Sequence, residues 1–95
     1  IEPGKGTQIL YITPLRALAR DLENALRLPI ESLDLKIRVE KRTGDTTGAA
    51  RKKQLKKPPE VLLTTPESLS LLLTTESAFD HLKMVIIDEW HELLG

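Results

Sequence analysis

The sequence contains no cysteine, which excludes disulfide bonds and any metal site built from thiolates. A chain without cysteine fits the reducing cytoplasm, so we expect a cytoplasmic protein. No apolar run approaches the roughly 20 residues that a membrane-spanning helix needs, and we therefore expect no membrane partner. Only three aromatic residues are present, one each of Trp, Tyr and Phe, so we expect an aliphatic core.

A net charge is also absent, but the zero total hides a segregation of charge along the chain. Residues 36–57 hold nine Lys or Arg against two Asp or Glu, whereas residues 58–95 hold one Lys against seven acids. The basic block suits a polyanion and the acidic block a cation, although two solvated helix faces of opposite sign are the alternative. The same alternative applies to the basic residues of one expected helix, Arg51, Lys52, Lys53, Lys56 and Lys57.

Apolar runs alternate with stretches of helical periodicity, and this alternation predicts an α/β fold with a mainly parallel sheet of about four strands. With 95 residues, the chain fits one small domain or part of a larger one. Strands are expected at residues 8–13, 36–42, 61–64 and 84–87, and helices at residues 14–27, 49–57, 66–73 and from residue 88.

The first expected helix has a clear beginning and end. Thr13 is expected to cap it, with Pro14 in its first turn, and Pro29 is expected to stop it. The alternating run 36–42 predicts a half-exposed or edge strand. Helical spacing predicts a buried stripe along the first helix, made of Leu15, Leu18, Ala19, Leu22, Ala25 and Leu26, and the polar connection before the last strand is expected to contribute Phe79 and Leu82 to the core.

The run Met84–Ile87 leads directly into two carboxylates, Asp88 and Glu89. Four apolar residues in a row predict a strand buried on both faces of a parallel sheet. In such sheets, ligands bind beyond the carboxyl ends of the strands. One carboxylate there can hold Mg²⁺, and its neighbour can position a water for attack on a phosphoryl group. The alternative is a core strand followed by a helix whose first turn is acidic to suit its dipole.

Polar motifs follow the other predicted strands as well. Thr13-Pro14 follows the first, Gly44-Asp45 the second and Thr65 the third. Because the carboxyl ends of parallel strands meet at one edge of the sheet, all these motifs are expected along the same rim as Asp88. The sequence therefore predicts a functional edge.

These motifs resemble those of superfamily 2 helicases of the DEAD/DEAH type. Residues 88–91 (Asp-Glu-Trp-His) resemble motif II, residues 13–18 (Thr-Pro-Leu-Arg-Ala-Leu) motif Ia, residues 44–45 the glycine motif, and residues 65–67 (Thr-Pro-Glu) motif Ib. Their order and approximate spacing agree with that family over nearly the whole chain. The sequence is most similar to the large helicase-related (Lhr) proteins, and the resemblance implies a RecA-like (P-loop NTPase) three-layer fold.

The resemblance also implies roles for single residues. Asp88 would bind Mg²⁺ through water, and Glu89 would contact the metal and orient or deprotonate the attacking water. His91 would link the nucleotide site to a neighbouring motif, with packing in a helical turn as its alternative. The residues implied to bind the backbone of a nucleic-acid strand are Thr13, Pro14, Arg16, Gly44, Asp45 and Thr65, and helix capping is the alternative role of Thr65.

By resemblance, residues 1–95 form part of helicase ATP-binding domain 1, from motif Ia to motif II. The Walker A loop is expected before Ile1 and the second RecA-like domain after Gly95. The full-length protein is then expected to be an ATP-dependent helicase that uses ATP and Mg²⁺ on a DNA or RNA single strand, with a role in DNA repair. The 95 residues alone are expected to be inactive, and to pair through exposed sheet edges with the remainder of the helicase or with themselves.

Two other functions are compatible with parts of the sequence. A non-catalytic nucleic-acid-binding or interaction fragment would use only the basic strand and helix. A P-loop ATPase of another type would share the acidic strand end, but motifs Ia and Ib count against it.

Overall fold

The computed structural model describes residues 3–73 and 79–88. Its elements follow in the order β1 (Ile9–Ile12), α1 (Arg16–Ser32), β2 (Val39–Arg42), α2 (Gly48–Lys56), β3 (Val61–Thr64), α3 (Pro66–Leu72) and β4 (Met84–Ile87). The four strands form one sheet in the order β2-β3-β1-β4, and every neighbouring pair is parallel. This arrangement confirms the predicted α/β fold, and β2 lies at an edge as expected.

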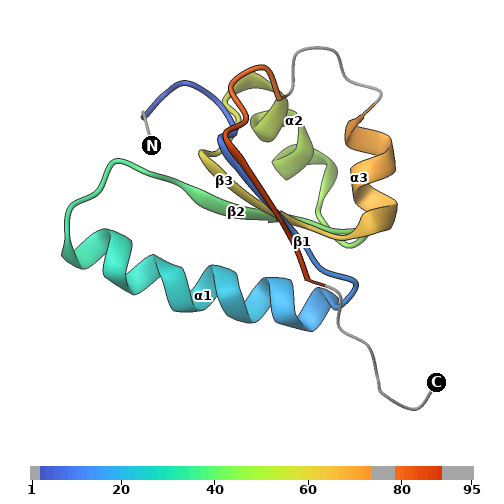
Figure 1. Cartoon of the computed structure of the whole chain (residues 1–95), viewed down its shortest axis with the longest axis horizontal. Coiled ribbons are helices and arrows are strands. Elements are labelled where there is room, and N and C mark those ends of the chain that lie inside the picture. Colours follow the sequence, from blue (N-terminus) through green and yellow to red (C-terminus); the bar gives the residue numbers. More distant parts are fainter. Residues whose placement is uncertain (1–2, 74–78, 89–95) are drawn as a thin grey trace.

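Helices lie on both faces of the sheet, which gives three layers (Figure 1). Helix α1 covers β2 and β3 on one face, and α2 and α3 lie on the other. No helix in the described part of the chain is long and apolar enough to cross a membrane. Strand side chains alternate between two small cores. Ala19, Val39 and Leu63 form the core under α1, whereas Leu10, Ile12, Leu62 and Leu72 form the core under α3, where Phe79 and Leu82 also pack as predicted.

The expected start of the first helix is wrong by two residues. Helix α1 begins at Arg16, and no side chain caps its first turn. Thr13 stays with the sheet because its amide donates to Thr64 O (2.9 Å). Its hydroxyl accepts a hydrogen bond from the Leu15 amide (3.2 Å), which makes a short turn before the helix instead of a cap.

The expected end of the first helix is also wrong, because α1 continues through Pro29 to Ser32. Proline removes the hydrogen bond to the carbonyl four residues earlier, here that of Ala25. Both residues are exposed, so water can satisfy that carbonyl. The last turn is then closed by the Leu33 amide, which donates to Pro29 O (3.0 Å).

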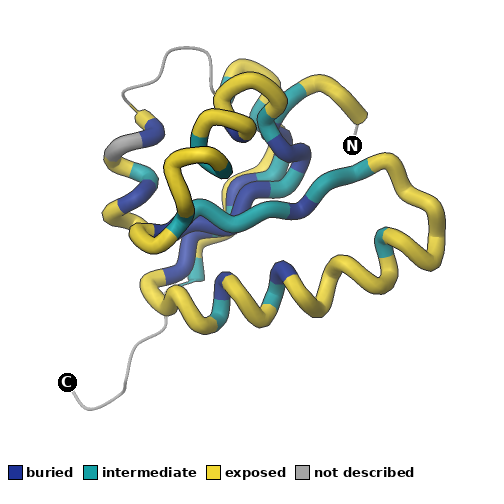
Figure 2. Tube along the Cα trace, turned by 180° about the vertical axis from the view of Figure 1, so that it is seen from behind, coloured by how far each residue is buried: buried dark blue, intermediate teal, exposed yellow. Residues whose placement is uncertain are grey.

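The predicted apolar stripe of α1 is only partly buried. Ala19 is fully buried, and Leu18 and Leu22 are half-buried, but Ala25 is exposed. Leu15 and Leu26 are each 39% exposed. Figure 2 shows the buried residues concentrated on the central strands, with most of α1 exposed. The helix rests chiefly on β2 and β3, whereas its side toward Ile86 of β4 borders an apolar groove lined by Leu22 and Leu26.

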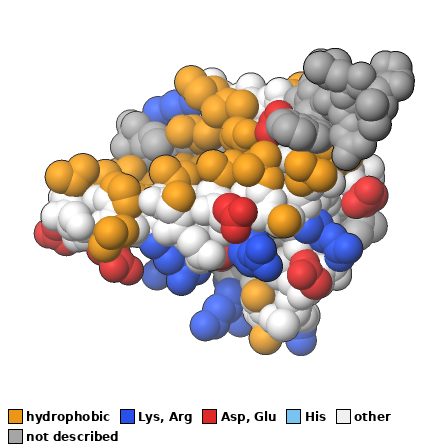
Figure 3. Space-filling view, turned by 90° about the horizontal axis from the view of Figure 1, so that it is seen from below, with side chains coloured by type: hydrophobic (Ala, Val, Ile, Leu, Met, Phe, Trp, Pro, Cys, Tyr) orange, Lys and Arg blue, Asp and Glu red, His pale blue; other side chains and the backbone are white. Residues whose placement is uncertain are grey.

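Strand β4 differs most from its prediction, because it forms an edge of the sheet and all four of its residues are exposed. Burial on both faces needs a neighbouring strand and a helix on each side, and in the described part of the chain β4 pairs with β1 alone. Figure 3 shows hydrophobic side chains gathered in a band on the α1 side. An apolar groove of about 330 Å³ has lining residues from α1 and from the sheet, which include Tyr11, Leu22, Leu26 and Ile86.

Candidate functional site

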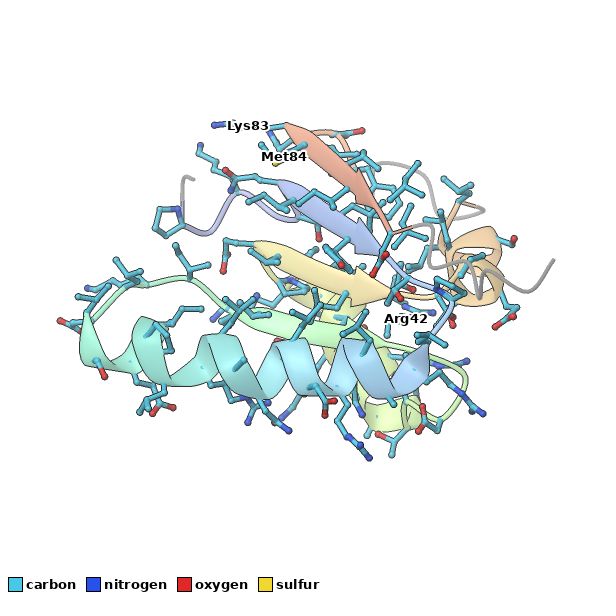
Figure 4. All side chains as sticks on the ribbon, turned by 60° about the horizontal axis from the view of Figure 1, so that its bottom comes forward. Arg42, Lys83 and Met84 are labelled. Carbon is cyan, nitrogen blue, oxygen red and sulfur yellow. The ribbon has the colours of Figure 1, made fainter. Side chains whose placement is uncertain are left out.

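The parallel sheet brings the four predicted motifs to one rim. Thr13 follows β1, Thr43 and Gly44 follow β2, Thr65 follows β3, and Asp88 follows β4. Figure 4 shows the direction of the sheet: Arg42 lies at the carboxyl ends of the strands, whereas Lys83 and Met84, where β4 begins, lie at the opposite end. The rim is therefore a single edge at which the loops of all four strands meet.

Asp88 is held in place at the end of β4 by two hydrogen bonds. Its amide donates to Ile12 O (2.8 Å), which extends the ladder with β1, and its Oδ2 accepts a hydrogen bond from the hydroxyl of Tyr11 (3.0 Å). Burial, and then the bond to Asp88 and the charge of its carboxylate, raise the pKa of Tyr11. Asp88 Oδ1 has no partner among the described residues, so this carboxylate keeps a ligand position available.

The residues present fit a Mg²⁺ ion that is held chiefly by water and phosphate. Among the described residues, no three His, Cys, Asp or Glu side chains gather into a metal cage. Mg²⁺ is commonly bound through one or two carboxylates and otherwise by waters and phosphate oxygens, and Asp88 offers one such oxygen. Glu89 and His91, the other predicted residues of the nucleotide site, lie outside the described residues.

The residues after β1 divide into a buried and an exposed group. Thr13 is fully buried, and its hydroxyl is used by the Leu15 amide. Pro14 and Arg16 are exposed. Arg16 opens α1, where the free amides of the first turn add positive potential. An anion at this turn can therefore meet the Arg16 side chain but not the Thr13 hydroxyl.

The turn after β2 is exposed and tightly hydrogen-bonded. The Thr43 hydroxyl donates to the Asp45 carboxylate, and this bond is the main reason that the pKa of Asp45 lies below its usual value. A backbone hydrogen bond and the charges of Lys41 and Arg16 lower that pKa further. Gly44 is open, since a Cβ placed there would meet nothing within 4 Å. Arg16 and Asp45 thus act on each other across the rim, although they come from different strand ends.

Thr65 is buried, and its hydroxyl serves the start of α3. Its Oγ1 accepts a hydrogen bond from the Ser68 amide (3.4 Å) and donates to Ser68 Oγ (3.1 Å). The structure therefore shows the capping role that the sequence left open as an alternative. Pro66 and Glu67 beside it are exposed.

Sequence reasoning overlooked two features of the rim. Tyr11, which binds Asp88, lies directly opposite Ile86 in the β1–β4 register. A tyrosine within an otherwise aliphatic strand was the available signal. Arg51 also donates a hydrogen bond to Thr43 O, the carbonyl directly after Arg42, and here the signal was a basic residue two positions before Gly44.

Comparison with known proteins gives a consistent result. A model of the DEAD/DEAH box helicase family matches residues 2–95. The chain is 44% identical over 96 residues to the ATP-dependent helicase Lhr-Core of Methanothermobacter thermautotrophicus, covering 88% of this chain and 11% of that protein. It is also 41% identical, over an alignment of 102 positions, to a protein of Mycolicibacterium smegmatis named Lhr helicase/probable uracil glycosylase. This alignment covers 95% of this chain and 7% of that protein.

Solved structures also resemble this chain. One of them is the Mycobacterium smegmatis helicase Lhr bound to ssDNA and AMP-PNP, with a TM-score of 0.72 and 44% sequence identity. The match covers 88% of this chain and 12% of that protein. The described elements are thus a partial RecA-like α/β domain, and the chain spans only about a tenth of the length of such relatives.

Proposed function

The chain belongs to the DEAD/DEAH box helicase family, and on that premise we propose that it forms part of the first ATP-binding domain of an ATP-dependent helicase of the Lhr type. The observation that carries the proposal is the rim: one parallel sheet brings a carboxylate for the nucleotide side and an exposed arginine for the nucleic-acid side to the same edge. The relative solved with both ssDNA and AMP-PNP supports the presence of a nucleic-acid site and a nucleotide site.

On the nucleotide side, Asp88 would hold Mg²⁺ through water, with Tyr11 fixing the carboxylate by its bond to Oδ2. Mg²⁺, when bound with ATP, would neutralise charge on the phosphates. Glu89 would touch the metal shell and orient or deprotonate the attacking water, and His91 would link this site to a neighbouring motif. These two roles rest on the sequence, because both residues lie outside the described part.

On the nucleic-acid side, Arg16 and the backbone at Gly44 would contact phosphates of one strand of DNA or RNA. Contacts of this kind position a strand without reading its sequence, which suits a protein that moves along it. Pro14 and Asp45, which are both exposed, would border the path. Thr13 and Thr65 are buried, so they would shape the turns that border the path.

The exposed apolar strand β4 supports a further part of the proposal. In the full-length helicase, the strand bearing the Walker A loop would pair with the sheet, and the second RecA-like domain would complete the nucleotide site. The 95 residues alone would then lack ATPase activity, and would self-associate through the exposed edge of β4.

We also propose a cytoplasmic location and a role in DNA repair. The absence of cysteine supports the first, and fractionation of cells would test it. Relatives named as both helicase and uracil glycosylase support the second. A deletion strain that is no more sensitive to DNA damage than its parent would contradict that role.

The central test is to replace Arg16 in the full-length protein and measure the binding of a single strand at several salt concentrations. Arg16→Ala should weaken binding about tenfold, because it removes a charge-assisted hydrogen bond to a phosphate. The slope of log K against log salt should become shallower by about 0.7 for each phosphate that the variant no longer neutralises. Arg20→Ala is the matched control, since Arg20 is exposed one turn along α1 and pairs with Asp21 (3.6 Å).

Two results would contradict the proposal. If Arg16→Ala and Arg20→Ala bind equally well, Arg16 does not contact the strand. The full-length protein should hydrolyse ATP, and Glu89→Gln should abolish this activity. If the protein binds single strands but has no such ATPase activity, the non-catalytic alternative holds instead.

A further inference from the structure

The six arginines of the chain fall into two groups. Three form ion pairs with carboxylates, namely Arg20, Arg27 and Arg38. The other three have no carboxylate oxygen within 4.0 Å in the described part of the chain. All three lie at the carboxyl rim: Arg16 opens α1, Arg42 ends β2, and Arg51 reaches the turn after β2. Arg16 already has a proposed role, whereas the positions of Arg42 and Arg51 are still unexplained.

Arg42 is fixed by its backbone but not by its side chain. It is the last residue of β2, and its carbonyl accepts a hydrogen bond from the Thr64 hydroxyl (2.7 Å). Its guanidinium group makes no hydrogen bond and no ion pair with any described residue. Figure 4 shows Arg42 at the rim. A half-buried guanidinium with five donors and no acceptor is a costly arrangement in the absence of an anion.

Arg51 comes from α2 and approaches the same place. Its Nη2 donates to Thr43 O (3.3 Å), the carbonyl directly after Arg42. Its Nε is buried and has no partner among the described residues. Burial, and then the charge of Arg51, lower the pKa of Arg42. The charge of Arg51 therefore acts on Arg42, and no carboxylate oxygen of the described residues lies within 4.0 Å of either guanidinium group to offset it.

We propose that Arg42 and Arg51 form a phosphate-binding site beside Gly44, which holds the backbone of a single nucleic-acid strand at the β2 end of the rim. The planar guanidinium group matches phosphate oxygens in pairs, and an anion between two such groups removes their repulsion. Gly44 next to them leaves the backbone open to close approach. The site rests on the proposed function and extends the path of the strand beyond Arg16.

The neighbouring basic residues of α2 do not share this environment. Lys52 and Lys53 are exposed, so water can solvate their charges. Only Arg51 turns toward the rim, and only Arg51 has a buried nitrogen without a partner in the described region. Lys52 and Lys53 therefore offer a matched control, with the same charge, on the same helix, but away from the site.

The test uses the full-length protein and a fluorescent single strand of mixed sequence. Arg42→Gln and Arg51→Gln should each weaken binding about tenfold and make the salt slope shallower by about 0.7. Because both would bind one phosphate, the double variant should lose about tenfold as well, not about a hundredfold. Lys52→Gln combined with Lys53→Gln should change affinity less than about twofold.

A purely structural role predicts a different result in the melting temperature. Removing one of two repelling charges should leave the melting temperature of Arg42→Gln unchanged or raise it, whereas a side chain that stabilised the fold would lower it when replaced. If Arg42→Gln melts lower and binds normally, the site is refuted. Binding losses no larger than those of the lysine control refute it too. A weaker affinity for AMP-PNP with unchanged strand binding would assign the pair to the nucleotide instead, and also refutes it.

The proposed function and this site can fail separately. If Arg16→Ala weakens strand binding but the two arginine variants match the lysine control, only the site at β2 is wrong. If the full-length protein binds no single strand, the proposed function itself fails.

Discussion

The outer edges of β2 and β4 face the same physical problem, because each leaves a row of backbone groups without a neighbouring strand. At β2 the problem is solved by side chains. Glu23 Oε2 accepts a hydrogen bond from the Lys41 amide (3.0 Å), and Gln54 Nε2 donates to Lys41 O (3.1 Å). One acid from α1 and one amide from α2 thus satisfy the outward backbone groups of Lys41, as a neighbouring strand would.

At β4 nothing comparable occurs in the described part of the chain. The amides of Met84 and Asp88 donate to β1, so the alternating backbone groups of Val85 and Ile87 point outward. Their side chains are apolar and 48% and 62% exposed. This contrast with β2, whose residues are Val-Glu-Lys-Arg, supports the proposal that a neighbour covers β4 in the full-length protein.

The largest expected effect would come from placing a charge on β4. Val85→Asp in the full-length protein should lower the free energy of unfolding of this domain by about 3 kcal/mol or more, because the charge would be buried at an interface. In the 95-residue chain alone, the same change should cost under about 0.5 kcal/mol and should reduce self-association. Calorimetry of the full-length protein and light scattering of the short chain would measure both.

Leu55→Asp is the control for this comparison, since Leu55 is an apolar residue that is 54% exposed on α2 and not on β4. It should have a small effect in both proteins. If Val85→Asp and Leu55→Asp destabilise the full-length protein equally, then β4 is no more covered than α2, and the contrast between the two edges disappears.

A smaller effect is expected from opening the β2 edge. Glu23→Ala would leave the half-buried Lys41 amide without an acceptor and break the pairing of Glu23 with Arg27 (3.6 Å), at a cost of about 1–3 kcal/mol. Hydrogen exchange of the full-length protein should speed up in residues 39–42. Glu31→Ala, an exposed acid on the same helix, should leave exchange unchanged. Unaltered exchange after Glu23→Ala would mean that the edge is not closed by this side chain.

The smallest expected effect is a titration beside the β4 edge. Tyr11 is the sole tyrosine of the 95-residue chain, so phenolate absorbance reports it directly. Its raised pKa predicts a midpoint above 10, and Asp88→Asn should move that midpoint down. Because the folded-state pKa is raised, the stabilisation from Tyr11 is complete below pH 10 and is lost as pH rises through the folded value. A midpoint at or below 10 would contradict the bond to Asp88.

The strands were the most predictable part of the fold. Residues 61–64 form β3 at the predicted positions, and the order of motifs along the chain was enough to place them on one rim. These features depend on local apolar runs and on the rule that crossovers make parallel strands. The α3 helix was predicted to within one residue for the same reason, since Thr65 caps it locally.

The features that the sequence did not reveal depend on contacts distant in the chain. Thr13 fails to cap α1 because its amide is taken by Thr64 on the neighbouring strand. Pro29 fails to end α1 because the exposed carbonyl it releases can bind water. The exposure of β4 depends on which strand lies beside it, and the pairing of Arg42 with Arg51 joins residues of two elements. No local pattern carries this information.

The last residue of β1 and the residue after it are hydrogen-bonded to different neighbouring strands, β4 and β3. Ile12 O accepts the Asp88 amide (2.8 Å), while the next amide, that of Thr13, donates to Thr64 O (2.9 Å). One hydrogen bond from Asp88 to Ile12 and four residues of backbone therefore join the nucleotide side of the rim to Arg16 on the nucleic-acid side.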